Sequence, residues 1–303
     1  MIPALATAVF FALSAIFARR SALLVGSQRA NLARQLLALL LLGIWAHSWG
    51  QGLHGASFWI LLLSGIIGFG LGDWALFEAY PRIGSALTIL LCQCLAAPIA
   101  AVTEWLFLGT TMTLAQVGSS GLILLGVGLA MAPEHGSDIP TGHRVAGILY
   151  GIVAAMGQAW GAVLSRVAYS RAEEGGVSID GLTAAYQRLW GGVLCLGVLL
   201  VIRHLIQSRR APVAATVAFR PDWKLGWPWV VGNALAGATL GVSCFQWALK
   251  STPSAVVLPI VATTPLVVMI IAFAFEGIRP RGKAIVGAVL AVTGVVLLVR
   301  LSS

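Results

Sequence analysis

The stretch LGDWALFEAYPRIGSA (residues 71–86) has a counterpart in the second half of the chain, LGVSCFQWALKSTPSA (residues 240–255). Both stretches begin with Leu-Gly, have alanine at the ninth position and end in Ser-Ala. A proline follows within the next apolar segment of each half, at Pro98 and at Pro265. The chain therefore contains an internal repeat, and its fold must accommodate both copies.

The composition places both copies in a membrane. Of the 303 residues, 59% are hydrophobic and only 10% are charged, and the mean hydropathy is +0.93, whereas about a quarter of the residues in a soluble domain are charged. A helix of about 20 apolar residues crosses the hydrocarbon core of a bilayer. The pattern predicts an all-α integral membrane protein with ten transmembrane helices, at residues 2–22, 31–50, 56–79, 84–108, 113–133, 145–168, 181–206, 226–249, 253–275 and 282–301.

The repeat divides these ten helices into two sets of five. We expect a first domain at residues 1–133, a linker at 134–144 and a second domain at 145–303. Because five is an odd number, the second copy enters the membrane from the opposite side, so the two halves must be inverted relative to each other. In membrane proteins built this way, a binding site commonly lies between the repeats, near the middle of the bilayer.

Further matched positions connect the chain to a known family. Arg34 and Arg188 open the second predicted helix of each half, and Glu276 ends the ninth. Together with the glycine-rich third helices and the two prolines, this pattern resembles the EamA-type exporters of the drug/metabolite transporter (DMT) superfamily. The resemblance covers nearly the whole chain and implies a multi-pass transporter of the cell (inner or plasma) membrane that is not an enzyme. One departure is that Gly109 stands where the second half has Glu276, while the first half has an acid earlier, at Glu104.

The run Gly-Leu-Gly-Asp at residues 70–73 also resembles the motif of intramembrane aspartyl proteases. Such an enzyme needs two carboxylates close enough to share a proton. The other three aspartates fall in or beside predicted loops, and the rise of a helix places Glu104 roughly 15 Å from Asp73 in membrane depth. We therefore interpret the run as small residues that precede a single embedded acid.

Polar groups inside predicted helices are functional candidates, because a charged side chain at the centre of a membrane costs about 2.5–3.5 kcal/mol. Gln93 and Glu104 are eleven residues apart, close to three helical turns, so both project from one face of the fourth predicted helix. The alternative for Glu78 and Glu104 is that their carboxylates extend to the membrane surface. We expect the substrate cavity and the coupling site among Asp73, Trp74, Glu78, Gln93, Glu104, Gln158 and Trp160.

The two repeat-related arginines are candidates for gates. The inverted arrangement predicts that Arg34 pairs with Asp73 or Glu78 and that Arg188 pairs with Glu104, each at its own end of the molecule. The alternative is that both arginines anchor lipid phosphates.

Pro98 and Pro265 are expected to break their helices. A proline has no N–H to donate, so these two residues leave the carbonyls of Cys94 and Val261 without their helical partners. At the depth of a cavity, free carbonyls can bind a substrate or allow bending.

Several other classes of partner do not fit. The net charge of +9 is scattered between apolar segments, so we expect no nucleic-acid partner. The four cysteines lack the neighbours that a metal site needs, and the sequence has no GxxxxGK[ST] loop for ATP. We therefore expect no cofactor and no metal. The expected partners are the lipid bilayer, a small-molecule substrate and protons as the candidate coupling ion, and the sequence is compatible with a monomer.

The orientation in the membrane has two opposed indications. Of the nineteen Lys and Arg residues, fourteen fall on the face opposite the two termini, which predicts that the termini lie outside the cell. The family resemblance implies that the termini lie inside. The five basic residues on the face of the termini are Arg166, Arg171, Arg188, Lys250 and Arg300.

Taken together, these features predict a secondary-active transporter that exports small metabolites, with amino acids among the candidates, by alternating access of two inverted repeats. Asp73 and Glu104 are the candidates for carrying a coupled proton. An efflux transporter of cationic drugs is the alternative within the same class. From other classes, a non-transporting membrane assembly subunit and the intramembrane protease remain as alternatives.

Overall fold

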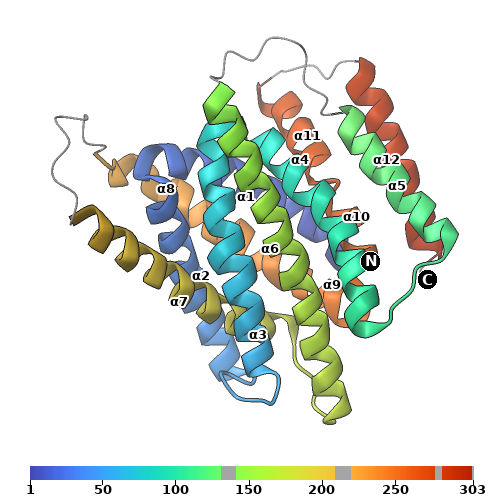
Figure 1. Ribbon diagram of the computed structural model, residues 1–303, viewed down its shortest axis with the longest axis horizontal. Coiled ribbons are helices and arrows are strands. Elements are labelled where there is room, and N and C mark those ends of the chain that lie inside the picture. Colours follow the sequence, from blue (N-terminus) through green and yellow to red (C-terminus); the bar gives the residue numbers. More distant parts are fainter. Residues whose placement is uncertain (131–140, 209–219, 277–281, 302–303) are drawn as a thin grey trace.

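A computed structural model describes residues 1–130, 141–208, 220–276 and 282–301, and every regular element within these ranges is a helix. Figure 1 shows the helices packed side by side in one bundle. The elements of the first half are α1 (Ile2–Val25), α2 (Ser27–Ser48), α3 (Phe58–Gly65), η1 (Ile66–Gly72), α4 (Asp73–Leu108) and α5 (Leu114–Ala130). The elements of the second half are α6 (Thr141–Glu174), α7 (Gly181–Ser208), α8 (Trp223–Asn233), η2 (Ala234–Gly241), α9 (Val242–Ser251), α10 (Ser254–Val261), α11 (Thr264–Glu276) and α12 (Gly282–Leu301).

Within the described ranges, nine helical segments are long and apolar enough to cross a membrane. The tenth predicted segment corresponds to α5, which is apolar but only 17 residues long; residues 131–133 of that prediction lie outside the described residues. The predicted linker is only partly described, and its last residues, 141–144, already belong to α6. The ten-helix, all-α prediction is thereby confirmed.

The fifth helices of the two halves, α5 and α12, run in opposite directions along one edge of the bundle (Figure 1). Gln116, near the start of α5, donates from Nε2 to the carbonyl of Leu301, at the end of α12, over 3.4 Å. Gly126, two to three turns later in α5, contacts Gly287 near the start of α12; a Cβ added to Gly126 would lie 2.6 Å from the Gly287 carbonyl oxygen. Equivalent helices that run antiparallel are what an inverted repeat requires.

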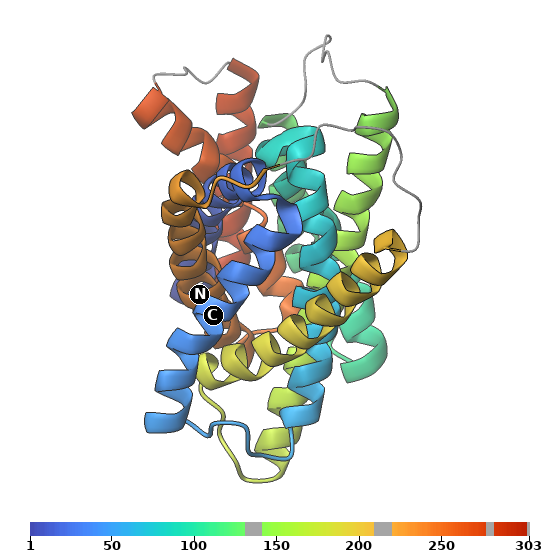
Figure 2. The same cartoon turned by 90° about the vertical axis from the view of Figure 1, so that its left-hand side faces the viewer.

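Helices near the centre of the bundle also pack against helices of the other half. The π-helical segment η1 of the first half packs against α6 and α7, and η2 of the second half packs against α1 and α2. The second helices of the halves, α2 and α7, pack against each other, with the α7 helix crossing the others obliquely in Figure 2. The third helix of each half therefore lies against the first two helices of the other half, so the centre of the molecule is an interface between the halves.

Each third predicted helix contains a π-helical segment at the matching place, η1 in one half and η2 in the other. A π-helical turn contains one residue more than an α-helical turn and is rare. It leaves backbone groups available to other partners, and here the amide of Gln35 donates to the carbonyl of Phe69 in η1 over 3.1 Å. The glycines permit close packing at this point, because a Cβ added to Gly72 would lie 3.1 Å from the Cα of Gly157 on α6. Hydropathy alone predicts only one continuous apolar helix here.

The two matched prolines have different surroundings, and the expectation that both break a helix is wrong for Pro98. Helix α4 turns back at Gly84 (φ 78°) and then continues through Pro98, as neighbouring helices often allow in a membrane. Pro265 follows a real break between α10 and α11 and is the second residue of α11, a position where a proline costs no hydrogen bond. The carbonyl of Val261 accepts a hydrogen bond of 2.6 Å from the Thr264 hydroxyl.

Small side chains bring the central helices together. Helix α1 buries a stripe of alanines that recur every three or four residues, and it contacts helices of both halves. Packing through small residues is typical of helices in lipid, where large apolar side chains can face outward. The exposed surface of α7 follows this rule, with Leu194, Val198 and Val201 more than half exposed. The bundle therefore has a polar centre and an apolar exterior.

Candidate functional site

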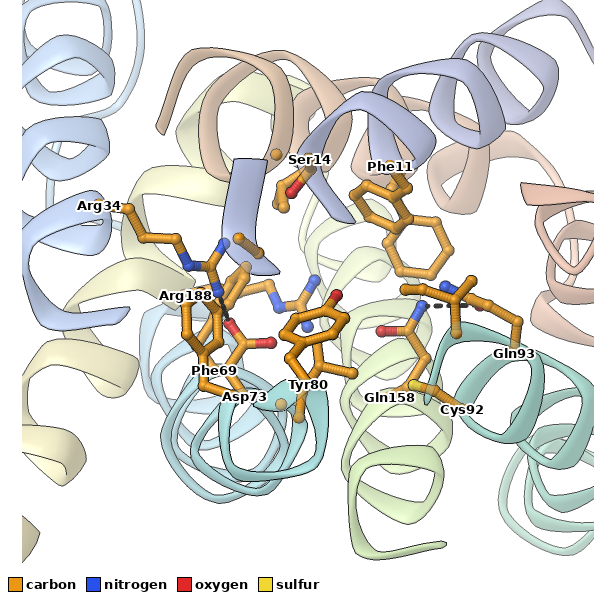
Figure 3. A pocket seen from close by; sticks show the side chains of 18 residues that line it. Phe11, Ser14, Arg34, Phe69, Asp73, Tyr80, Cys92, Gln93, Gln158 and Arg188 are labelled. Carbon is orange, nitrogen blue, oxygen red and sulfur yellow. Dashed lines mark hydrogen bonds and ion pairs between the residues drawn. The ribbon is translucent and has the colours of Figure 1, made fainter. Parts of the chain in front are cut away.

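A cavity lies at the centre of the molecule, between the halves (Figure 3). Its described lining comes from α1, α2, η1, α4, α6, α7, η2 and α9, so both halves contribute. The space open to the centre of a water molecule is about 60 Å³, enough for several waters. The polar and aromatic lining residues are Phe11, Ser14, Arg34, Phe69, Asp73, Phe77, Tyr80, Gln93, Gln158, Arg188 and Phe245.

Asp73 and Arg34 form an ion pair in this cavity, between Nη2 of Arg34 and Oδ2 of Asp73. Asp73 is the first residue after η1, and Arg34 is held by Asn31, whose Oδ1 accepts from Arg34 Nε over 3.2 Å. The guanidinium carbon of Arg34 lies 4.8 Å from the centre of the Phe77 ring, close enough for a cation–π contact. This is the pairing that the inverted repeat predicted for Arg34. Its role as a gate stays a prediction.

The predicted pairing of Arg188 with Glu104 is wrong. Arg188 extends into the central cavity, between the Arg34–Asp73 pair and the Gln93–Gln158 pair in the view of Figure 3. Its side chain lies in a slot between Gly68 and Gly161, since a Cβ added to either glycine would lie 3.0 Å from Arg188 Nη2. The residue is 4% exposed, and its Nε and Nη1 atoms have no hydrogen-bond partner among the described residues.

Glu104 is not part of the described lining of the cavity. It links the end of α4 to the start of α10. Its carboxylate is fully buried, accepts from the Ser254 hydroxyl and from the Ala255 N–H (3.1 Å), and lies 3.4 Å from Arg166 Nε. Arg166 also donates to the carbonyl of Leu249 over 2.8 Å. Glu104 does share a helix face with Gln93, but three turns further along α4 that face is covered by α6 and α10. The carboxylate thus caps the start of α10.

Glu78 and Trp74 belong to a lateral groove instead of the central cavity. Glu78 accepts 2.6 and 2.9 Å hydrogen bonds from Arg82 and Gln28, and the Trp74 ring packs edge-on against Tyr150 at 5.6 Å. Both side chains therefore have protein partners away from the cavity.

Three of the seven predicted cavity residues do line the cavity. They are Asp73, Gln93 and Gln158, and Gln158 Nε2 lies 3.4 Å from Gln93 Oε1. Trp160 is 39% exposed on α6 and is not part of the described lining. Gln158 and Trp160 therefore lie on different faces of α6, and only the face with Gln158 lines the cavity.

Sequence reasoning missed the aromatic lining and the residues that support Asp73. Phe11, Phe69 and Phe245 form part of the cavity wall, but in the sequence they look like any lipid-facing aromatic residue. Gln35 supports η1 through the Phe69 carbonyl. A glutamine directly after an embedded arginine in an apolar segment was a signal that could have identified it.

The arrangement can bind a charged solute and exchange ion pairs, but it lacks the parts of a hydrolytic site. Asp73 is the one carboxylate in the described lining, and its partner is an arginine, so the lining contains no aspartyl dyad. Among the residues that the structure describes, no group of three His, Cys, Asp or Glu side chains could hold a metal ion.

Comparisons with known proteins agree with this picture. The sequence profile of the EamA-like transporter family matches residues 1–132 and 145–300. A solved structure described only as a crystal structure of a protein has the same fold, with a TM-score of 0.69 at 15% identity over 98% of this chain and 96% of that one. A search of curated proteins finds no match. The family profile covers nearly the whole chain, and the protein is accordingly a multi-pass membrane protein that belongs to the EamA-like transporter family.

Proposed function

We propose that the protein is a secondary-active transporter that exports small polar or amphipathic metabolites by alternating access. Family membership implies membrane transport. We assign the two moving units to residues 1–133 and 145–303, joined by the linker 134–144. The observation that carries the proposal is the central cavity, because it is lined by both halves and contains buried charged groups.

Alternating access would depend on two sets of contacts that lie at different depths in the molecule. The Glu104 cluster joins α4, α6, α9 and α10 beyond the cavity. The Arg34–Asp73 pair joins α2 to the start of α4 within the cavity. Glu104 belongs to the first half and its partners to the second, so movement of one half against the other would loosen the Glu104 cluster. The Arg34–Asp73 pair lies within the first half, where protonation of Asp73 or binding of a solute would open it. The π-helical segments η1 and η2 lie at this moving interface, where such segments are common in functional sites.

Asp73 is the better candidate for coupling to protons. It lines the cavity, and adding a proton to its carboxylate would remove the charge that holds Arg34. Glu104 has three protein partners and does not face the cavity, which supports a structural role. A proton that binds at Asp73 would therefore free Arg34 and change the charge of the cavity in the same step.

The charge of the lining favours metabolite export over the efflux of cationic drugs. Two arginines and one aspartate are among the described lining residues, and this excess of positive charge repels a cation. The narrow interior also favours a small solute in this conformation. A buried polar cavity would serve no purpose in a subunit that only supports assembly.

The proposal is tested by reconstitution. The purified protein in liposomes is loaded with members of a metabolite panel, and exchange of labelled solute is followed for the wild type, Asp73→Asn and the control Glu173→Gln, which alters an exposed residue at the end of α6. We expect exchange of at least one solute, its loss in Asp73→Asn and its retention in the control. Absence of exchange for every solute, with folded protein in the liposomes, would contradict the proposal.

A further inference from the structure

Arg188 has a buried positive charge that forms no ion pair or hydrogen bond among the described residues. The residue is 4% exposed, and neither Nε nor Nη1 has a hydrogen-bond partner among the described residues. Its guanidinium carbon lies 5.0 Å from the centre of the Phe69 ring, a cation–π contact that provides no negative charge. An unpaired charge in the interior of a membrane protein is costly and marks a functional position. The structure therefore leaves a place beside Arg188 for a group of opposite charge.

Comparison of the two halves shows which group is missing. Arg34 and Arg188 are equivalent in the repeat, and Arg34 has its partner in Asp73, directly after Leu71-Gly72. After the matching Leu240-Gly241 the second half has Val242, which also lines the cavity. The first half thus supplies a carboxylate to its arginine and the second half supplies a methyl-bearing side chain. A carboxylate that enters with a solute would complete the second pair.

We propose that Arg188 binds the carboxylate of a small organic anion, so that the transported substrates are monocarboxylates with an apolar or aromatic body. The inference rests on the proposed transport function, since it names the solute that the cavity accepts. The planar guanidinium can donate two parallel hydrogen bonds to one carboxylate. The described lining has two arginines and one aspartate, so a ligand with a single negative charge makes the cavity neutral. A phosphate dianion would instead leave the cavity with a net negative charge.

The rest of the lining suits the body of such a molecule. Phe11, Phe69 and Phe245 offer apolar walls, and the Gln93–Gln158 pair can donate or accept at the far side. Gly68 and Gly161 have no side chain that would collide with Arg188 Nη2, and Gly68 and Arg188 both belong to the described lining of the cavity. The narrow interior excludes large anions in this conformation.

The first test varies the ligand and leaves the protein unchanged. Benzoate, benzamide and benzylamine have the same aromatic body and differ in the charge of the head group. Their binding to the purified wild-type protein is measured by calorimetry in detergent. We expect benzoate to bind about tenfold or more tightly than benzamide, and benzylamine to bind weakest, because a hydrogen bond to a charged group contributes more than a neutral one. Equal affinities, or a preference for the amine, would overturn the inference.

The second test varies the protein. Arg188→Gln should abolish the preference for benzoate, and Arg188→Lys should keep part of it, because lysine retains the charge without the planar fork. The control Arg203→Gln changes an arginine of the lateral groove and should leave the preference intact. Val242→Asp places an internal carboxylate in the same cavity and should weaken benzoate binding, whereas its uncharged match Val242→Asn should not. A benzoate preference that survives Arg188→Gln would overturn the inference.

The outcomes separate this inference from the proposed transport function. If the liposomes exchange a neutral or cationic solute and benzoate does not bind, the inference fails and transport stands. If benzoate binds through Arg188 and no solute is exchanged, the binding site stands and the proposed transport function fails.

Discussion

The hydroxyl of Ser254 donates a hydrogen bond to the carboxylate of Glu104, which joins the first residue of α10 to the end of α4 across 150 positions of the sequence. The same carboxylate accepts from the Ala255 N–H and pairs with Arg166. The acid is fully buried, so these partners replace the water that it loses. Its position at the start of a helix is favourable for a negative charge.

Replacement of Glu104 by glutamine should therefore affect stability more than coupling. The substitution removes the ion pair with Arg166 and weakens the cap of α10, and we expect the free energy of unfolding to fall by about 1–3 kcal/mol. Thermal unfolding in detergent measures the loss, and liposome flux at several pH values measures coupling. A variant with wild-type stability whose flux no longer responds to pH would contradict this assignment.

Replacement of Asp73 by asparagine should cost both stability and transport. The change leaves Arg34, which is 5% exposed, without its partner, and removal of one member of a buried ion pair typically costs about 3–5 kcal/mol. The double variant Arg34→Gln/Asp73→Asn removes both charges and should regain part of the stability but none of the flux. Unfolding and flux of the wild type, Asp73→Asn, Arg34→Gln and the double variant form a thermodynamic cycle. If the single variant proves as stable as the wild type, the pair contributes nothing measurable.

Addition of one methyl group at Gly161 should disturb the slot that holds Arg188. A Cβ there would lie 3.0 Å from Arg188 Nη2 and 3.3 Å from the Cα of Gly68, so we expect Gly161→Ala to lower the free energy of unfolding by about 1–3 kcal/mol. Gly128 on α5 is the matched control, because a Cβ there meets nothing within 4 Å. Gly128→Ala should be neutral or stabilising by up to about 1 kcal/mol. Equal effects of the two substitutions would show that the slot is not tightly packed.

The antiparallel arrangement of α5 and α12 predicts which cysteine pairs can be cross-linked. In a background without the four native cysteines, Gln116→Cys with Leu301→Cys should be linked by a short bifunctional reagent, because these residues are in contact. Gln116→Cys with Lys283→Cys places the second thiol near the opposite end of α12 and should not be linked. The reverse result, read from the migration of a chain cleaved between the halves, would require parallel helices and exclude an inverted repeat.

The orientation of the chain in the membrane stays a prediction. The excess of Lys and Arg on the face opposite the termini predicts that the C-terminus lies outside the cell. A reporter enzyme that is active only outside, fused after residue 303, should therefore be active. Activity of a cytoplasm-specific reporter at the same position would favour the opposite orientation, which the family resemblance implied.

Much of the fold could be predicted because the bilayer acts on each segment separately. Every apolar stretch must form a helix to satisfy its backbone, so hydropathy locates the helices without knowledge of their neighbours. The repeat and its odd number of helices then predict the inversion that α5 and α12 display. The pairing of Arg34 with Asp73 followed from the same reasoning, since both residues lie at one depth on adjacent helices.

The surroundings of the polar side chains could not be predicted in this way. Arg188 and Glu104 have suitable charges and related positions, yet one faces the cavity and the other caps α10. Pro98 and Pro265 match in the repeat, and only the second adjoins a helix break. These outcomes depend on how far each helix is rotated about its own axis and shifted along its neighbours.

The amino-acid sequence by itself determined that this protein is a helical membrane protein of two inverted halves with an acid and an arginine inside its apolar segments. The tertiary structure decided where the π-helical turns fall, which side chains enter the cavity and which arginine has no ion pair among the described residues. The physical reason is that burial in lipid depends on the local average of hydropathy, whereas each ion pair depends on atoms that contacts between distant helices bring within a few ångströms of each other.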